Sequence, residues 1–201
     1  MRVLGIRAPL LRQYVKQERP RLLMAHGEEV VGLGKALVDS QIFEARQLAY
    51  LMLNDNAHAM LALSANDLIQ LGKGMDNWAS VDAYSTLLSG TLWRDGKIPD
   101  EMIQGWTGSV DPWWRRAALV STIPLNLKSR GGKGELTRTL DICNRLKEDP
   151  DRMVRKALSW ALRELSKRYP TEVCDFMETN RQTLPSIIRL EVMHKISDSF
   201  K

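Results

Sequence analysis

A tryptophan flanked by two cations is the first group in this sequence with a spacing that suggests chemistry. In the segment 151–165, apolar residues recur at helical spacing and form one stripe of Val154, Ala157, Leu158, Ala161, Leu162 and Leu165. At about 100° per residue, Trp160 lies roughly 130° from the centre of that stripe, between Lys156 and Arg163. An exposed indole beside two cations can stack on a nucleic-acid base and bind nearby phosphates. The alternative is that this face packs against a neighbouring helix.

A second group pairs an aromatic ring with a carboxylate. In DNWASVDAYSTLL, helical spacing assigns Val81, Tyr84 and Leu88 to the buried side, and Trp78 and Asp82 share the edge of that stripe at i,i+4 spacing. The two side chains are therefore expected to project together. The structural alternative makes Trp78 an ordinary core residue and Asp82 a surface carboxylate or a helix cap.

By helical spacing, the segment DPWWRRAALVST separates a buried face from an exposed face less clearly. Its tryptophans and alanines spread around the helix, so Arg115 and Arg116 are both expected to point outward, and one of Trp113 and Trp114 is expected in the core.

Other classes of site are not expected. The two cysteines, Cys143 and Cys174, lack CxxC spacing, and the three histidines stand without cysteine or carboxylate at metal-ligand spacing. We therefore expect no disulfide framework, no metal site and no cofactor. The first residues carry three arginines and no apolar run of membrane-spanning length, which predicts a cytoplasmic protein without a membrane segment.

The net charge of +5 comes from the second half of the chain. Residues 1–100 hold 11 basic and 11 acidic side chains, whereas residues 101–201 hold 18 and 13, a difference of 18 − 13 = 5. The segment 115–168 is denser still, with 14 basic against 6 acidic residues. Such a stripe favours a polyanionic partner, although a solvated helical surface is the alternative.

Part of this charge lies in a glycine-rich stretch, KSRGGKG, at residues 128–134. The stretch resembles a flexible linker but lacks the Walker A pattern, so we predict a basic loop between helices that carries Lys128, Arg130 and Lys133.

The whole chain, residues 1–201, is predicted to form one all-α domain. Strand patterns are almost absent, and helices are expected to begin near Ala8, Glu28, Phe43, Ser64, Asn77, Pro99, Trp113, Gly134, Asp151, Pro170 and Pro185. Faint similarity among FEARQLAYLML, WWRRAALVSTI and VRKALSWALREL recurs at roughly 35 to 40 residues, an interval typical of HEAT-like helical repeats that stack into an α-α superhelix.

Several of these segments, in order, resemble the AlkD-type DNA glycosylases, a HEAT-like family that acts on alkylated DNA. The resemblance covers most of the chain and rests on LGIRAPLLRQ, FEARQLAYLML, NWASVD, DPWWRRAAL and KALSWALRELSKRYP. Its most specific elements are the W-x-S-V-D of residues 78–82, the R-A-A of residues 116–118 and the S-W-x-L-R-E of residues 159–164.

This resemblance implies a role for the residues singled out above. Asp82 matches the catalytic carboxylate of the family, Trp78 and Trp160 match two aromatics that contact the lesion-bearing nucleotide, and Arg116 matches an arginine that grips the DNA backbone. The resemblance implies that the partner is double-stranded DNA carrying alkylated purines. From their charge and spacing, Arg115, Lys156, Arg163 and the three cations of the 128–134 loop are expected as further DNA contacts, and we expect a monomer.

The implied reaction is hydrolysis of the N-glycosidic bond of cationic N3- or N7-alkylated purines. Because such a base already carries a positive charge and leaves neutral, no acid need protonate it. One carboxylate can stabilise the oxocarbenium-like sugar and position water, while indole faces attract the same positive charge.

Two features depart from the family pattern. Family members carry additional helices before the segment resembling LGIRAP, so we expect an incomplete DNA-binding surface. The family also often has paired tryptophans before its S-V-D element, where this chain has Asn77 and Trp78. A non-catalytic DNA-binding relative and a helical-repeat scaffold for proteins therefore remain alternatives to a glycosylase.

Overall fold

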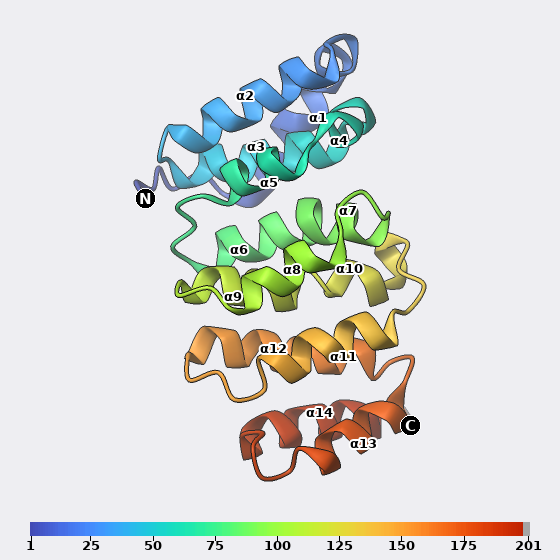
Figure 1. Ribbon diagram of the computed structural model, residues 1–201. Helices are drawn as coiled ribbons and strands as arrows, with labels where there is room; N and C mark the ends of the chain where they lie inside the picture. The colour runs from blue at the N-terminus through green and yellow to red at the C-terminus, as the bar shows by residue number, and fades with distance from the viewer. Residues whose placement is uncertain (199–201) are drawn as a thin grey trace. The chain divides into compact units, whose positions relative to one another are not determined.

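The computed structural model describes residues 1–198, which form helices joined by short connections (Figure 1). They divide into two compact units, one made of residues 1–92 and the other beginning at residue 93, so the boundary falls within the short helix α7 (Gly90–Arg94). The all-α, HEAT-like fold predicted from the sequence is confirmed.

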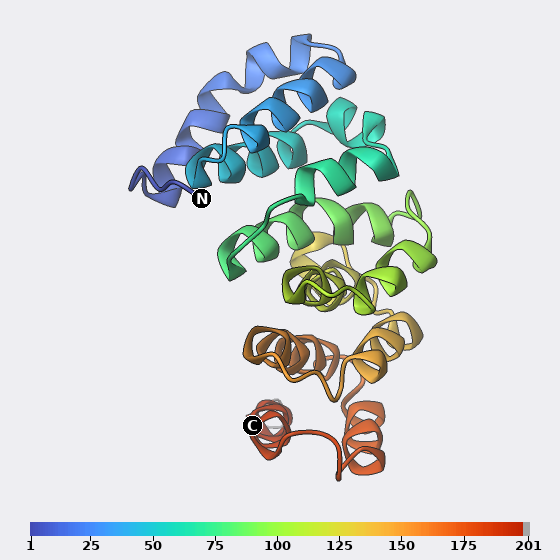
Figure 2. The ribbon, with the colours of Figure 1, turned by 60° about the vertical axis from the view of Figure 1, so that its left-hand side comes forward.

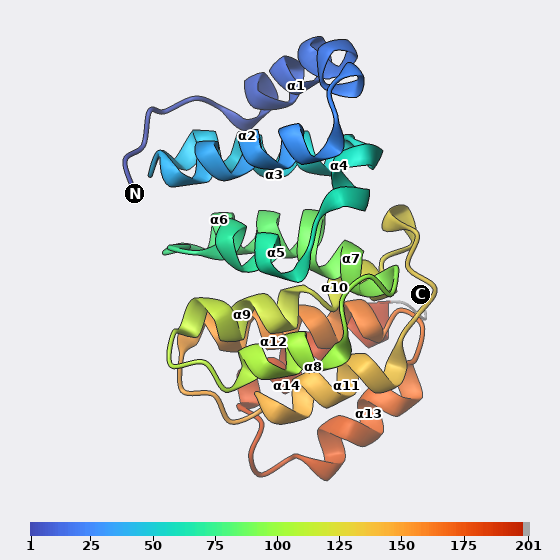
Figure 3. The same cartoon turned by 45° about the horizontal axis from the view of Figure 1, so that its top comes forward.

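The first unit contains two layers of helices. One layer holds α1 (Ala8–Met24), α3 (Phe43–Asp55) and α6 (Trp78–Tyr84), with α3 in contact with the other two. The second layer holds α2 (Gly27–Asp39), α4 (Ala57–Ala62) and α5 (Ala65–Gly72), which pack against α3 and α6 (Figure 3). A π-helical turn, η1 (Ser85–Ser89), continues α6.

The second unit repeats this two-layer pattern. Its helices are α8 (Asp100–Thr107), α9 (Pro112–Val120), α10 (Ile123–Asn126), the 3-10 turn η2 (Lys128–Arg130), α11 (Leu136–Arg145), α12 (Arg152–Leu165), α13 (Pro170–Thr179) and α14 (Ser186–Asp198). Helix α12 packs between α9 and α14 in one layer, and α8 and α11 contact each other in the other layer (Figure 2).

All eleven predicted helices are present, and each begins within two residues of its predicted start. The sequence pattern did not predict α4, α7 and α10, which have six, five and four residues and are too short to show a helical period.

The amphipathic patterns also hold. All six residues of the predicted α12 stripe are at most 1% exposed, and Val81, Tyr84 and Leu88 are fully buried. Within residues 1–198, no helix is long and apolar enough to cross a lipid bilayer.

Candidate functional site

Trp78 opens α6 and is exposed. The side chain of Asn77 caps the helix by accepting a hydrogen bond of 2.9 Å from the Ser80 amide, so Trp78 occupies the first helical position. The residue is 57% exposed, which excludes the alternative of a core tryptophan. Asp82 lies one turn further along α6 and is half-buried.

A buried polar network holds α6 against α3 and α5. The Tyr84 hydroxyl donates to the Leu68 carbonyl at 2.9 Å, and its ring packs 5.7 Å from that of Tyr50. Tyr50 in turn donates to the Leu71 carbonyl at 2.8 Å and accepts from Arg46 at 3.0 Å. Burial raises the pKa of Tyr50 to about 12, although Arg46 opposes the shift, so the phenol stays a donor at neutral pH.

The backbone changes its winding three residues after Asp82, at Ser85. Residues 85–89 form a π-helical turn, and the Thr86 hydroxyl donates to the Asp82 carbonyl at 2.7 Å. Single π turns inside helices are frequent at functional sites. The regular α-helical geometry therefore ends within one turn of the Asp82 carboxylate.

In the second unit, Trp160 is half-buried on α12. Its neighbour Lys156 is exposed, and Arg163 is half-buried with its Nε donating to the Ser159 carbonyl at 3.3 Å. The Asp151 carboxylate caps the helix by accepting from the Met153 amide at 2.7 Å. This indole is thus neither fully in the core nor fully exposed.

The two adjacent arginines of α9 turn inward, which corrects the expectation that both point outward. Arg116 is 5% exposed and donates to the Met153 carbonyl at the start of α12. Arg115 forms an ion pair of 2.6 Å with Asp149 and donates to the Ser109 carbonyl at 2.9 Å. The hydrogen bond with Asp149 raises the pKa of Arg115. Both arginines tie α9 to the segment that leads into α12.

Neither tryptophan of α9 is a core residue, contrary to expectation. Trp113 and Trp114 are both half-buried, and the Trp114 ring lies 4.8 Å from that of Trp106.

The predicted basic loop lies between α10 and α11 and is held by backbone hydrogen bonds. The Gly132 amide donates to the Leu127 carbonyl, and the Gly134 amide donates to the Leu125 carbonyl, each at 3.0 Å. Gly131 takes a φ of +76°, which favours glycine. The 128–134 stretch is therefore a shaped loop rather than an unstructured linker.

The three cations of this loop differ in their surroundings. Lys128 and Lys133 are exposed, whereas Arg130 is half-buried. Burial and the nearby charge of Arg94 lower the pKa of Arg130. Lys128 and Lys133 are the members of the loop best placed to meet a polyanion.

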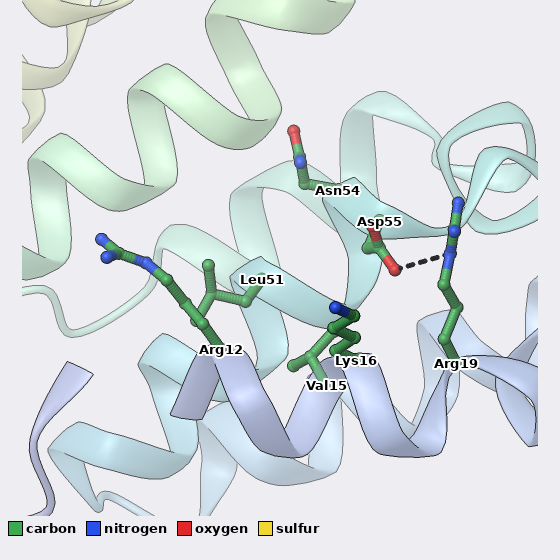
Figure 4. Close-up of a pocket in the computed structure, with 7 residues that line it drawn as sticks. All are labelled: Arg12, Val15, Lys16, Arg19, Leu51, Asn54 and Asp55. Atoms are coloured by element: carbon green, nitrogen blue, oxygen red, sulfur yellow. Dashed lines mark ion pairs between the residues drawn. The ribbon is translucent and has the colours of Figure 1, made fainter. Parts of the chain in front are cut away.

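Sequence reasoning overlooked a group of cations on α1. Arg12, Lys16 and Arg19 line a cavity of about 330 Å³ between α1 and α3 (Figure 4). Their i,i+4,i+7 spacing could have revealed them, but the balanced charge of residues 1–100 drew attention to the second half of the chain. The described residues contain no cluster of three or more His, Cys, Asp or Glu side chains that could hold a metal ion.

A family model described as "DNA alkylation repair enzyme" matches residues 1–196. The chain belongs to this DNA alkylation repair family. Among curated proteins, none matches the sequence significantly.

Several solved structures share the fold. A protein described as a "Predicted DNA alkylation repair enzyme from Enterococcus faecalis" has a TM-score of 0.72 and 19% identity, covering 94% of this chain and 85% of its own. The protein smu.31 from Streptococcus mutans UA159 has a TM-score of 0.62 and 21% identity, covering 93% of this chain and 98% of its own. AlkD2 from Streptococcus mutans has a TM-score of 0.60 and 22% identity, covering 93% of this chain and 97% of its own.

Proposed function

We propose that this member of the DNA alkylation repair family is a DNA glycosylase that releases cationic N3- or N7-alkylated purines from duplex DNA. The observation that supports the proposal best is the pair on α6, an indole that is 57% exposed and a carboxylate one turn away. Both types of side chain suit a cationic substrate. An indole face attracts a cation, and a carboxylate attracts the positive charge that develops on the sugar.

In the proposed reaction, the electrons of the N-glycosidic bond pass to the alkylated purine, which leaves as a neutral base. The sugar then carries the positive charge at C1′, next to the Asp82 carboxylate. Water adds to C1′ and loses a proton to the solvent, which leaves an abasic site. Removing one electrostatic stabiliser of this kind lowers kcat by roughly 10² to 10³ in other enzymes, so Asp82 should account for a loss of that size or larger.

The other candidate residues serve DNA binding in this proposal. Trp78 and Trp160 are each assigned a contact with the damaged nucleotide. Arg115, Arg116, Lys156 and Arg163, with the loop cations Lys128, Arg130 and Lys133, supply a positive field for the phosphates, whether by contact or at longer range. The protein acts as a monomer in the cytoplasm, with residues 1–201 as one functional domain.

The experiment that tests the proposal is base release from methylated duplex DNA. The purified protein should release 7-methylguanine or 3-methyladenine, and Asp82→Asn should release them at least about 10²-fold more slowly. Asp39→Asn is the matched control, because Asp39 is an exposed carboxylate at the end of α2. Wild-type protein that releases no base from several alkylated substrates contradicts the proposal.

A second candidate function is a DNA-binding relative that excises nothing. The burial of Arg116 and its hydrogen bond to the Met153 carbonyl favour it over a glycosylase, because the arginine that matches the family's backbone contact is engaged in the fold, so the family's reaction need not be retained. Such a protein binds duplexes with salt-dependent affinity in the same assay but releases no base. A protein scaffold, the third alternative, binds no DNA at low salt.

A further inference from the structure

The cavity between α1 and α3 has a floor and two different walls. Val15 is buried at its base beside the half-buried Leu51. Arg12, Lys16 and Arg19 line the α1 side, and Asn54 and Asp55 line the α3 side (Figure 4). The lining thus carries three cations against one carboxylate, in a half of the chain that has no net charge.

These three cations are not equivalent. Arg19 is paired with Asp55 at 3.1 Å, which neutralises the only acid of the lining. Arg12 and Lys16 are exposed, and within the described residues their side chains make no ion pair or hydrogen bond. Figure 4 shows the Arg12 guanidinium extended away from the Arg19–Asp55 pair. Two charged side chains that start about one helical turn apart on α1, roughly 6 Å along its axis, therefore remain for a ligand.

One face of α3 links this cavity to α6. Gln47, Leu51 and Asn54 follow one another at i,i+4,i+7 spacing, so they share that face. The Gln47 amide donates to the Ala79 carbonyl of α6 at 3.4 Å, beside Trp78, whereas Leu51 and Asn54 line the cavity. Because α1, α3 and α6 lie in one layer of the first unit, the cavity and the Trp78–Asp82 pair belong to neighbouring parts of the same layer.

We propose that this cavity is a binding site for the phosphodiester backbone of duplex DNA, with Arg12 and Lys16 each contacting one phosphate and the Asn54 amide donating a further hydrogen bond. The inference rests on the proposed DNA partner but assigns contacts to the first unit, which the charge distribution of the sequence did not suggest. The chemistry of the lining favours phosphates over bases, since the cavity has no aromatic side chain for stacking and no buried polar group for reading a base edge.

Such contacts position the DNA without reading its sequence or its damage. They should therefore contribute equally to the binding of methylated and unmethylated duplexes. Neutralising a phosphate releases counterions, so each phosphate that the protein neutralises makes the slope of log affinity against log salt steeper by about 0.9.

The test is a salt titration of duplex binding with the variant Arg12→Gln/Lys16→Gln. Its slope of log affinity against log salt should be shallower than that of the wild type by about 1.8. With the two affinities converging at about 1 M salt, its affinity near 0.1 M salt should be weaker by roughly 60-fold. Arg12→Lys/Lys16→Arg keeps both charges and should keep the wild-type slope. Lys73→Gln/Lys97→Gln removes the same charge from two exposed lysines outside the cavity and should change the slope by less.

The outcomes separate this site from the proposed reaction. A shallower slope in the Arg12→Gln/Lys16→Gln variant, with no base release by the wild type, supports the proposed phosphate site and contradicts the proposed glycosylase activity. An unchanged slope in a folded Arg12→Gln/Lys16→Gln protein overturns the proposed phosphate site, even if the wild type excises bases. Equal reductions of slope in the cavity and control variants, or a wild type that binds no duplex, overturn it as well. Inorganic phosphate at matched ionic strength should not abolish the difference in slope between variant and wild type. Phosphate binding to the wild type together with an unchanged slope in the variant would overturn the proposal, because the cavity would then bind only free phosphate.

Discussion

The Trp78 indole and the Asp82 carboxylate lie one turn apart on α6, but only the indole is mostly exposed. Helix α6 is held by the fully buried residues Val81 and Tyr84, on its other side. The exposed indole therefore contributes little to packing, and its position at the helix start suits contact with a ligand.

This arrangement predicts that Trp78→Ala separates activity from stability. We expect the free energy of unfolding to change by no more than about 0.5 kcal/mol, because the residue lies outside the core. Base release from methylated DNA should fall. Trp93→Ala is the contrasting variant, since Trp93 is 1% exposed and its removal should cost about 3 to 5 kcal/mol. Urea unfolding and an excision assay on the same preparations check both, and a large loss of stability in Trp78→Ala would contradict the assignment.

The ion pair between Arg115 and Asp149 predicts a structural role for this arginine. The Asp149 side chain is only 4% exposed, so Arg115→Ala leaves a buried carboxylate without its cation and should destabilise the protein by roughly 3 kcal/mol. In a double-mutant cycle with Asp149→Asn, the double variant should be destabilised by less than the sum of the two single variants. Lys156→Ala, which removes an exposed cation, should be near neutral. Wild-type stability in Arg115→Ala would show that the pair does not hold the fold.

A third prediction concerns the N-terminal segment, which is tied to α3 by Glu44. This carboxylate is 3% exposed and accepts backbone hydrogen bonds from Leu4 at 2.9 Å, Gly5 at 2.7 Å and Ile6 at 3.2 Å. Burial alone would raise the pKa of Glu44, but these hydrogen bonds outweigh it and hold the pKa below the ordinary value of 4.5. The stabilisation is therefore present above pH 4.5 and disappears as the pH falls through the lower, folded-state pKa.

Glu44→Gln should accordingly be less stable than the wild type by about 2 kcal/mol at neutral pH, and the difference should shrink in acid. Urea unfolding of both proteins across the acid range measures it, with Glu148→Gln as a control because Glu148 is exposed. A stability difference between wild type and Glu44→Gln that is constant with pH would argue against this account of the carboxylate.

Much of the fold could be predicted because the helices carry regular amphipathic patterns. The α12 stripe and the buried side of α6 follow directly from helical spacing. The π turn after Asp82 could not be predicted, since it depends on how residues 85–89 pack and not on a periodic pattern. The same holds for α10, which is a single turn.

The direction of charged side chains was harder to predict than the helices. Helical spacing leaves Arg115 and Arg116 on the polar side of α9. In the structure, Arg115 pairs with Asp149 and Arg116 donates to the Met153 carbonyl, and both partners lie over 30 residues away in the sequence. Trp78 is exposed, although its position at the edge of the stripe was also compatible with an ordinary core residue. Long-range partners decide the role of a cation, and a single helical wheel contains no information about them.

The central claim is that Asp82 performs the chemistry on alkylated purines, and its most direct test is base release by wild type and Asp82→Asn from the same methylated duplex. The proposal predicts release of 7-methylguanine or 3-methyladenine by the wild type, a reduction of at least about 10²-fold in Asp82→Asn, and DNA affinity within about two-fold of the wild type. Equal release by the two proteins would contradict it.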